Sequence, residues 1–182
     1  MGNRIYPIGI QNFEKIRKEG YVYVDKTALM YKLVKSGSYY FLSRPRRFGK
    51  SLLISTLEAY FEAKRDLFEG LAVETLEKDW VKRPVFHLDL NIGKYDTPDS
   101  LDKILNETLD YWESLYGTRS AETTLALRFA GVVGRAYEQS GERVAILIDE
   151  YDKPLLQAIG NEELQREFRN TLKPFYGVLK TM

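Results

Sequence analysis

The chain has 182 residues, a length typical of about one domain. Hydrophobic residues make up 44% of it and charged residues 29%, which is close to globular averages and excludes a mainly disordered chain. The formal net charge of +1 argues against a protein that coats nucleic acid through bulk charge, although it leaves room for a local basic patch. Because the chain has no cysteine and His87 is its single histidine, disulfides, thiolate metal sites and multi-histidine metal sites are excluded.

The longest clean apolar run covers residues 144–148, which is far too short to span a bilayer. The first residues also lack the apolar stretch of a secretory signal. We therefore expect a soluble cytoplasmic protein without a membrane partner.

The first part of the chain is predicted to be mainly helical. Residues 11–35 read as helix, interrupted by an extended patch at residues 20–24. Asp25 stands where the N-cap of a helix over residues 27–34 would lie, and Gly37 ends that helix. The elements expected next are a short aromatic strand at residues 38–42, a loop at 43–49 and a helix at 50–64.

The second half alternates strands with helices. Residues 85–90 and 144–148 are predicted strands, and the second is a continuous apolar run of the kind found in parallel strands buried on both faces. The alternation predicts an α/β fold with a largely parallel sheet. The predicted helices cover residues 100–116, with Gly117 as the stop, residues 121–139, and a segment that begins after Asn161 and that Pro174 should end or kink.

The strongest functional signal is R-P-R-R-F-G-K-S at residues 44–51, between a predicted strand and a predicted helix. Gly49 would let backbone N–H groups approach a polyphosphate, and Lys50 would place positive charge on its β- and γ-phosphates. The Ser51 hydroxyl can ligate Mg²⁺. The general phosphate-loop pattern has glycine where this chain has Arg44, so a basic surface turn is the alternative interpretation.

The arginines of the loop leave two interpretations open. Arg46 and Arg47 would either grip phosphates bidentately, or be solvated loop charges or contacts to nucleic acid. The candidate nucleotide-binding residues are Arg46, Arg47, Phe48, Gly49, Lys50, Ser51 and Leu52.

A second signal is the apolar run V-A-I-L-I followed by D-E-Y-D, the Walker B pattern. A buried strand carries Asp149 to the carboxyl edge of the sheet, where it would hold Mg²⁺ or a water bound to Mg²⁺. Glu150 would polarise the attacking water. Alone, the pattern also fits a strand followed by a helix-capping Asp. The two signals together, at strand ends and in this order, predict nucleotide binding.

Other polar residues near the strand ends have structural interpretations. Asp152 and Lys153 are interpreted as local charges at the mouth of the site. His87 lies in the middle of a predicted strand and is interpreted as a hydrogen-bonded structural histidine. Asp89 and Asn91 are expected to cap a turn rather than to reach a nucleotide.

Residues 44–51 and 147–154, with the opening P-I-G-I and Y-V-D-K-T segments, resemble the signatures of the predicted AAA-ATPase-like family of bacteria and archaea. The resemblance implies a P-loop NTPase of the additional-strand class, with a mostly parallel sheet flanked by helices. It assigns Lys50 and Ser51 to the nucleotide and metal, and Asp149 and Glu150 to the metal and water. Asp25 and Lys26 match a family motif whose role the sequence does not reveal.

The resemblance also implies a domain organisation. Residues 1–182 form a single domain, with a family-specific segment at residues 1–36 and a nucleotide-binding core at residues 37–182. Family members usually continue into a nuclease-like domain of the PD-(D/E)xK type, and E-A-K at residues 62–64 has only the E-x-K spacing of that motif. We therefore expect a piece of a longer protein that stops before the strand following Walker B, because residues 175–182 are too short and mixed to serve as that strand.

These observations favour an ATP-binding and ATP-hydrolysing domain that uses Mg²⁺. The alternative is a nucleotide-gated interaction module that hydrolyses little and regulates a nucleic-acid-processing partner domain. A third hypothesis, nucleic-acid binding through the basic loop, predicts steeply salt-dependent affinity for DNA.

Overall fold

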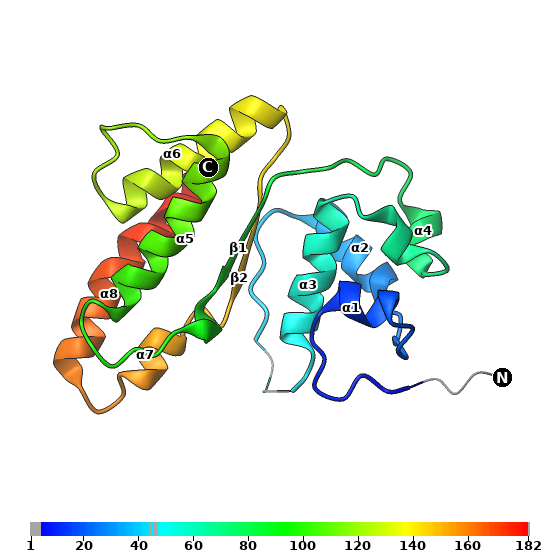
Figure 1. The fold of residues 1–182 in the computed structure, drawn as a ribbon, viewed down its shortest axis with the longest axis horizontal. Helices are drawn as coiled ribbons and strands as arrows, with labels where there is room; N and C mark the ends of the chain where they lie inside the picture. The colour runs from blue at the N-terminus through cyan, green and yellow to red at the C-terminus, as the bar shows by residue number, and fades with distance from the viewer. Residues whose placement is uncertain (1–4, 44, 46, 182) are drawn as a thin grey trace. The chain divides into compact units, whose positions relative to one another are not determined.

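A computed structural model describes residues 5–43, 45 and 47–181 (Figure 1). The fold is mixed α/β, mostly helical, with a small parallel sheet of two strands. The chain divides into two compact units, residues 1–85 and residues 86–182, which we describe separately. The expectation of one domain with a segment at residues 1–36 stays a prediction.

The first unit is a cluster of short helices around an aromatic core. The rings of Phe13 and Phe68 lie 4.9 Å apart, and Trp80 lies 5.2 Å from Phe68 and 5.7 Å from Tyr60. Phe13 and Phe68 are completely buried. The helices are α1 (Phe13–Lys18), α2 (Thr27–Ser36), the 12-residue α3 (Lys50–Phe61), the 3-10 turn η1 (Arg65–Phe68) and α4 (Ala72–Leu76).

Asp25 and Thr27 join the first turns of α2 and α4. The Oδ1 atom of Asp25 accepts hydrogen bonds from the backbone N–H and the hydroxyl of Thr27, at 2.8 and 2.7 Å. Its Oδ2 atom accepts from the Ala72 N–H at 2.7 Å, and the buried Thr27 hydroxyl oxygen accepts from the Val73 N–H at 3.1 Å. The N-cap residue of α2 is Lys26. Asp25, which was predicted to be the N-cap, therefore lies one residue before it. Asp25 and Thr27 therefore have a structural role, since they satisfy N–H groups at two helix starts.

The predicted strand at residues 38–42 does not form. These residues belong to no strand, and the sheet of the described residues consists of β1 and β2 alone. Tyr40 instead donates its hydroxyl to the carbonyl of Leu33 at 2.5 Å, which ties the segment to the end of α2. α3 begins at Lys50 as predicted but ends at Phe61, and Ala63, with a φ of 55°, takes the chain out of the helix.

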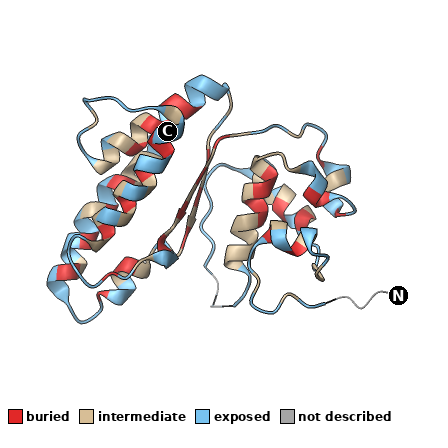
Figure 2. Cartoon of the chain, in the orientation of Figure 1, coloured by how far each residue is buried: buried red, intermediate tan, exposed pale blue. Residues whose placement is uncertain are grey.

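The second unit packs three long helices on one side of the sheet (Figure 1). Phe86 stacks on Trp112 with ring centroids 4.6 Å apart, and Phe129 stacks on Phe175 at 4.5 Å. Buried residues recur along one face of the last long helix (Figure 2). The elements are β1 (Val85–Asp89), η2 (Leu90–Ile92), α5 (Ser100–Tyr116), α6 (Leu125–Ser140), β2 (Ala145–Asp149), α7 (Lys153–Gln157), α8 (Glu162–Gly177) and η3 (Val178–Lys180).

Several boundaries in this unit differ from the predictions. β1 ends one residue early, and β2 is shifted by one residue toward the C-terminus. α6 begins at Leu125 rather than near residue 121, because the Thr124 hydroxyl accepts from the Leu127 N–H at 3.3 Å and caps the helix there. Asn161 caps α8 as predicted, by accepting from the Leu164 N–H at 3.1 Å.

The prediction that Pro174 ends the last helix is wrong. α8 continues past it to Gly177, and burial of the neighbouring Leu172 and Phe175 holds the final turn in place. Residues 175–181 complete α8 and form η3 rather than a strand, and β2 pairs with β1. Within the described part of the chain, no helix combines the length and apolar character needed to cross a membrane.

Candidate nucleotide-binding site

The loop before α3 takes the backbone form that glycine favours. Gly49 is the N-cap residue, with φ 75° and ψ 26° in the left-handed region. A Cβ at this position would meet no atom within 4 Å, so glycine is preferred here for its conformation rather than for space. Any other residue type would be strained by about 1–2 kcal/mol. Lys50 and Ser51 follow as the first two residues of α3, where backbone N–H groups and the helix dipole favour an anion.

The remaining loop candidates are more exposed. Arg47 has a φ of 68°, which is uncommon for a residue with a side chain. The Phe48 side chain is 63% exposed, and Leu52 lies half-buried in the first turn of α3. The predicted contact Arg46, like Arg44, lies outside the described residues.

The acidic pair lies in the second unit, at the carboxyl end of β2. Asp149 is the last residue of the strand and is buried. Its Oδ1 atom accepts a hydrogen bond from the Glu150 N–H at 3.0 Å. Glu150 has a φ of 51°, so the chain turns sharply after the strand in a conformation that costs on the order of 1–3 kcal/mol for a residue with a Cβ.

Two hydrogen bonds hold the turn after Glu150, one from a backbone N–H at the start of α7 and one from a side chain of α8. The Lys153 N–H donates to the Glu150 carbonyl at 2.9 Å, and the Tyr176 hydroxyl donates to the Tyr151 carbonyl at 3.2 Å. Burial raises the pKa of the Tyr176 phenol, so it remains a donor at neutral pH. These contacts support the left-handed conformation of Glu150.

Lys153 also joins this turn to the end of β1. Its Nζ atom donates to the backbone carbonyl of Asn91 and, at 2.9 Å, to the Asn91 side-chain oxygen. The Asp89 carboxylate accepts from the Asn91 N–H at 2.8 Å, as expected for a turn cap. The sequence interpretation of Lys153 as a local charge did not include its bonds to Asn91. The available signal was that both polar segments follow parallel strands, whose carboxyl ends lie at one sheet edge.

The residue types fit a magnesium ion that is shared with a nucleotide. The described residues contain no group of three or more His, Cys, Asp or Glu side chains suited to an all-protein metal cage. Mg²⁺ typically takes one or two carboxylates together with phosphate oxygens and water, so it does not need such a cage. The Ser51 hydroxyl in the first unit and the Asp149 carboxylate in the second are each a hard oxygen donor of this kind, and their sharing of one ion stays a prediction.

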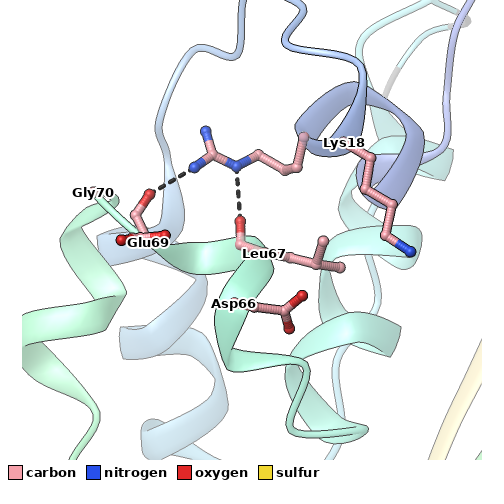
Figure 3. Close-up of a pocket in the computed structure, with 6 residues that line it drawn as sticks. Lys18, Asp66, Leu67, Glu69 and Gly70 are labelled. Carbon is pink, nitrogen blue, oxygen red and sulfur yellow. Dashed lines mark hydrogen bonds between the residues drawn. The ribbon is translucent and has the colours of Figure 1, made fainter.

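A pocket in the first unit is unrelated to these residues. It has a volume of about 390 Å³ and lies beside the Arg17 guanidinium, which donates to the carbonyls of Leu67 and Glu69 at 2.7 and 2.6 Å (Figure 3). These bonds engage the arginine with the backbone of the protein. The residues that line the pocket are Arg17, Lys18, Asp66, Leu67, Glu69 and Gly70.

Comparison with known proteins gives one curated relative. An uncharacterized protein encoded in the vnfD 5′ region of Azotobacter chroococcum mcd 1 is 40% identical over 182 residues, which cover 99% of this chain and 35% of the relative. The chain thus spans about a third of the relative's length. No solved structure matches the chain. The family model described as Predicted AAA-ATPase matches residues 7–182, nearly the whole chain, and the protein therefore belongs to this AAA-ATPase-like family.

Proposed function

We propose that this protein is a P-loop domain of the additional-strand class that binds ATP with Mg²⁺ and hydrolyses it. Membership of a predicted ATPase family implies nucleotide binding. The observation that carries the proposal is the left-handed Gly49 directly before a 12-residue helix that opens with Lys50 and Ser51. This arrangement presents backbone donors, a positive helix end and an ammonium group to a polyphosphate.

Each candidate residue has a distinct role in the proposed reaction. Lys50 stabilises negative charge on the transferring phosphoryl group, and the loop from Arg46 to Leu52 surrounds the phosphates. Ser51 and Asp149 would hold Mg²⁺, which when bound neutralises charge on the phosphate oxygens. Glu150 orients the attacking water and accepts its proton.

Replacing Lys50 tests the binding site. Lys50→Ala should weaken ATP binding at least about tenfold, because it removes a charged contact to the phosphates. The fold should be unchanged, since Lys50 lies at a helix start outside the buried core. Lys32→Ala, at an exposed lysine of α2, is the control for loss of charge. Equal affinities of Lys50→Ala and wild type in calorimetry would show the site assignment to be wrong.

Replacing Glu150 separates hydrolysis from binding. Glu150→Gln keeps the size of the side chain but removes the basic carboxylate, so affinity for ATP should stay near the wild-type value while turnover falls about 10²- to 10⁴-fold. Phosphate release and nucleotide affinity are measured on the same preparations. Equal turnover of the two proteins contradicts the role of Glu150. Tight ATP binding by a wild type without turnover favours the nucleotide-gated interaction module.

The relative is longer than this chain, and the family resemblance implies a nuclease-like domain beyond the ATPase unit. We therefore also propose that the ATP cycle controls a partner domain that processes nucleic acid. Comparing the nucleic-acid processing of a full-length relative with that of its Lys50→Ala equivalent tests this, and equal activities in the presence of ATP would contradict it.

A further inference from the structure

We propose that Lys153 is a positioning residue for Glu150, and that it acts by fastening the turn after β2 to the end of β1. This inference rests on the proposed ATPase function. It assigns to Lys153 and Asn91 a role that the phosphate-loop and Walker B patterns do not contain.

A continuous path of hydrogen bonds joins the ends of the two strands. It runs from the Asp89 carboxylate to the Asn91 N–H, and from both oxygens of Asn91 to the Lys153 ammonium group. The Lys153 N–H then donates to the Glu150 carbonyl at 2.9 Å. A single residue thus contacts η2, directly after β1, with its side chain and the Glu150 turn with its backbone.

The conformation of Glu150 explains why such a link is useful. Its φ of 51° is unfavourable for a residue with a Cβ, so the turn persists only where surrounding contacts hold it. Pro154 follows Lys153 directly and limits the backbone to the opening turn of α7. The Lys153 ammonium group adds a contact from this turn to η2, which directly follows β1.

The bonds from Lys153 to Asn91 are better suited to positioning Glu150 than to stabilising the folded protein. Asn91 is exposed and Lys153 is only half-buried, and a hydrogen bond in such a place contributes little to the free energy of unfolding. Small displacements of a catalytic carboxylate nevertheless reduce turnover strongly. Loss of the ammonium group should therefore lower kcat without unfolding the protein.

The experiment compares Lys153→Met with Lys153→Arg and with a control, Lys173→Met, at an exposed lysine of α8. Methionine keeps the apolar stem and removes the charge, whereas arginine can still donate to both oxygens of Asn91. Amide hydrogen exchange at residues 150 and 153 is measured without nucleotide. ATP affinity and kcat are measured alongside it.

Lys153→Met should exchange at least about fivefold faster at these amides and lose about 10- to 100-fold in kcat, with ATP affinity unchanged. Lys153→Arg should recover most of both losses, and Lys173→Met should match wild type. In the Glu150→Gln background, Lys153→Met should add little further loss, since the group it positions is already gone.

Three results would overturn the inference: unchanged exchange in Lys153→Met, faster exchange with a wild-type kcat, or a failure of arginine to restore kcat. Turnover that is equal in Lys153→Met and wild type refutes the positioning role alone. Absence of turnover in wild type refutes the proposed function, and the positioning role with it.

Discussion

Gly131 in α6 leaves room for a buried ion pair. A Cβ at this position would overlap the Glu122 carboxylate, which lies 2.5 Å from the Nη1 atom of Arg135. The Nε and Nη2 atoms of Arg135 are buried without a hydrogen-bond partner among the described residues, so Glu122 is the group that compensates its charge. Gly131→Ala should push Glu122 away and lower the free energy of unfolding by about 2–4 kcal/mol, measured by urea denaturation.

Gly134 provides the matched control in the same helix. It is exposed, and a Cβ there would meet no atom within 4 Å. Gly134→Ala should therefore raise the free energy of unfolding by about 0.5–1 kcal/mol through helix propensity alone. A Gly131→Ala protein as stable as Gly134→Ala would contradict the importance of the Glu122–Arg135 pair.

The left-handed conformation of Glu150 predicts a conflict between stability and activity. Glu150→Gly should relieve backbone strain and raise the free energy of unfolding by about 1 kcal/mol, because glycine takes a positive φ without penalty. It should also abolish turnover, as Glu150→Gln does. Denaturation midpoints and phosphate release are measured for both variants.

Glu150→Gln is the control for the loss of the carboxylate, since it keeps the Cβ and its strain. It should leave stability near the wild-type value, within about 0.5 kcal/mol. If Glu150→Gly is no more stable than Glu150→Gln, the backbone at residue 150 is not strained in solution.

The packing of the first turn of α2 against that of α4 depends on one polar residue. Thr27 is completely buried, donates to Asp25 and accepts from the Val73 N–H at the start of α4. Thr27→Val keeps the shape of the side chain but loses both hydrogen bonds, so it should cost about 1–3 kcal/mol in urea denaturation. Thr75→Val, at an exposed position of α4, should change stability by less than about 0.5 kcal/mol. Equal losses in the two variants would contradict the proposed contribution of the joint between α2 and α4.

The Asp25 carboxylate gives that joint a pH dependence. Burial acts to raise its pKa, but the hydrogen bonds from Thr27 and Ala72 outweigh burial and hold the pKa below the ordinary 3.8. A lowered pKa in the folded state means that the stabilising effect is fully present above the unfolded value and is lost as pH falls through the folded value. The stability difference between wild type and Asp25→Asn should therefore shrink as pH falls below 3.8. A difference that stays constant with pH would contradict this assignment.

Some element positions were predictable from local signals. The start of α3 at Lys50 follows from a glycine before an apolar helical pattern. The start of α8 follows from Asn161, whose side chain caps the helix. The end of α8 was not predictable, because Pro174 is a helix breaker in isolation. Burial of Leu172 and Phe175 outweighs the missing N–H, and such burial cannot be read from a single segment.

For the whole chain, ligand binding should appear as thermal stabilisation. A ligand present at a hundred times its Kd adds about 2.7 kcal/mol to the folded state. In a chain of this size, that corresponds to a rise in Tm of roughly 5–10 °C. Mg-ATP should produce this shift in wild type, and Lys50→Ala or removal of Mg²⁺ should reduce it. A shift of equal size in Lys50→Ala would place nucleotide binding elsewhere.

The phosphate-loop and Walker B candidates, and the strand before Asp149, could be predicted from order and spacing along the chain. Helix caps, apolar periodicity and glycine positions act between near neighbours, so the sequence carries them directly. Three features could be known only from the tertiary structure. They are the absence of a strand at residues 38–42, the hydrogen bond from the Ala72 N–H to Asp25, and the link from Lys153 to Asn91. Each of these depends on whether a residue far along the chain supplies a partner, because strands need a neighbour to hydrogen-bond with and polar side chains bond to the groups that folding brings near.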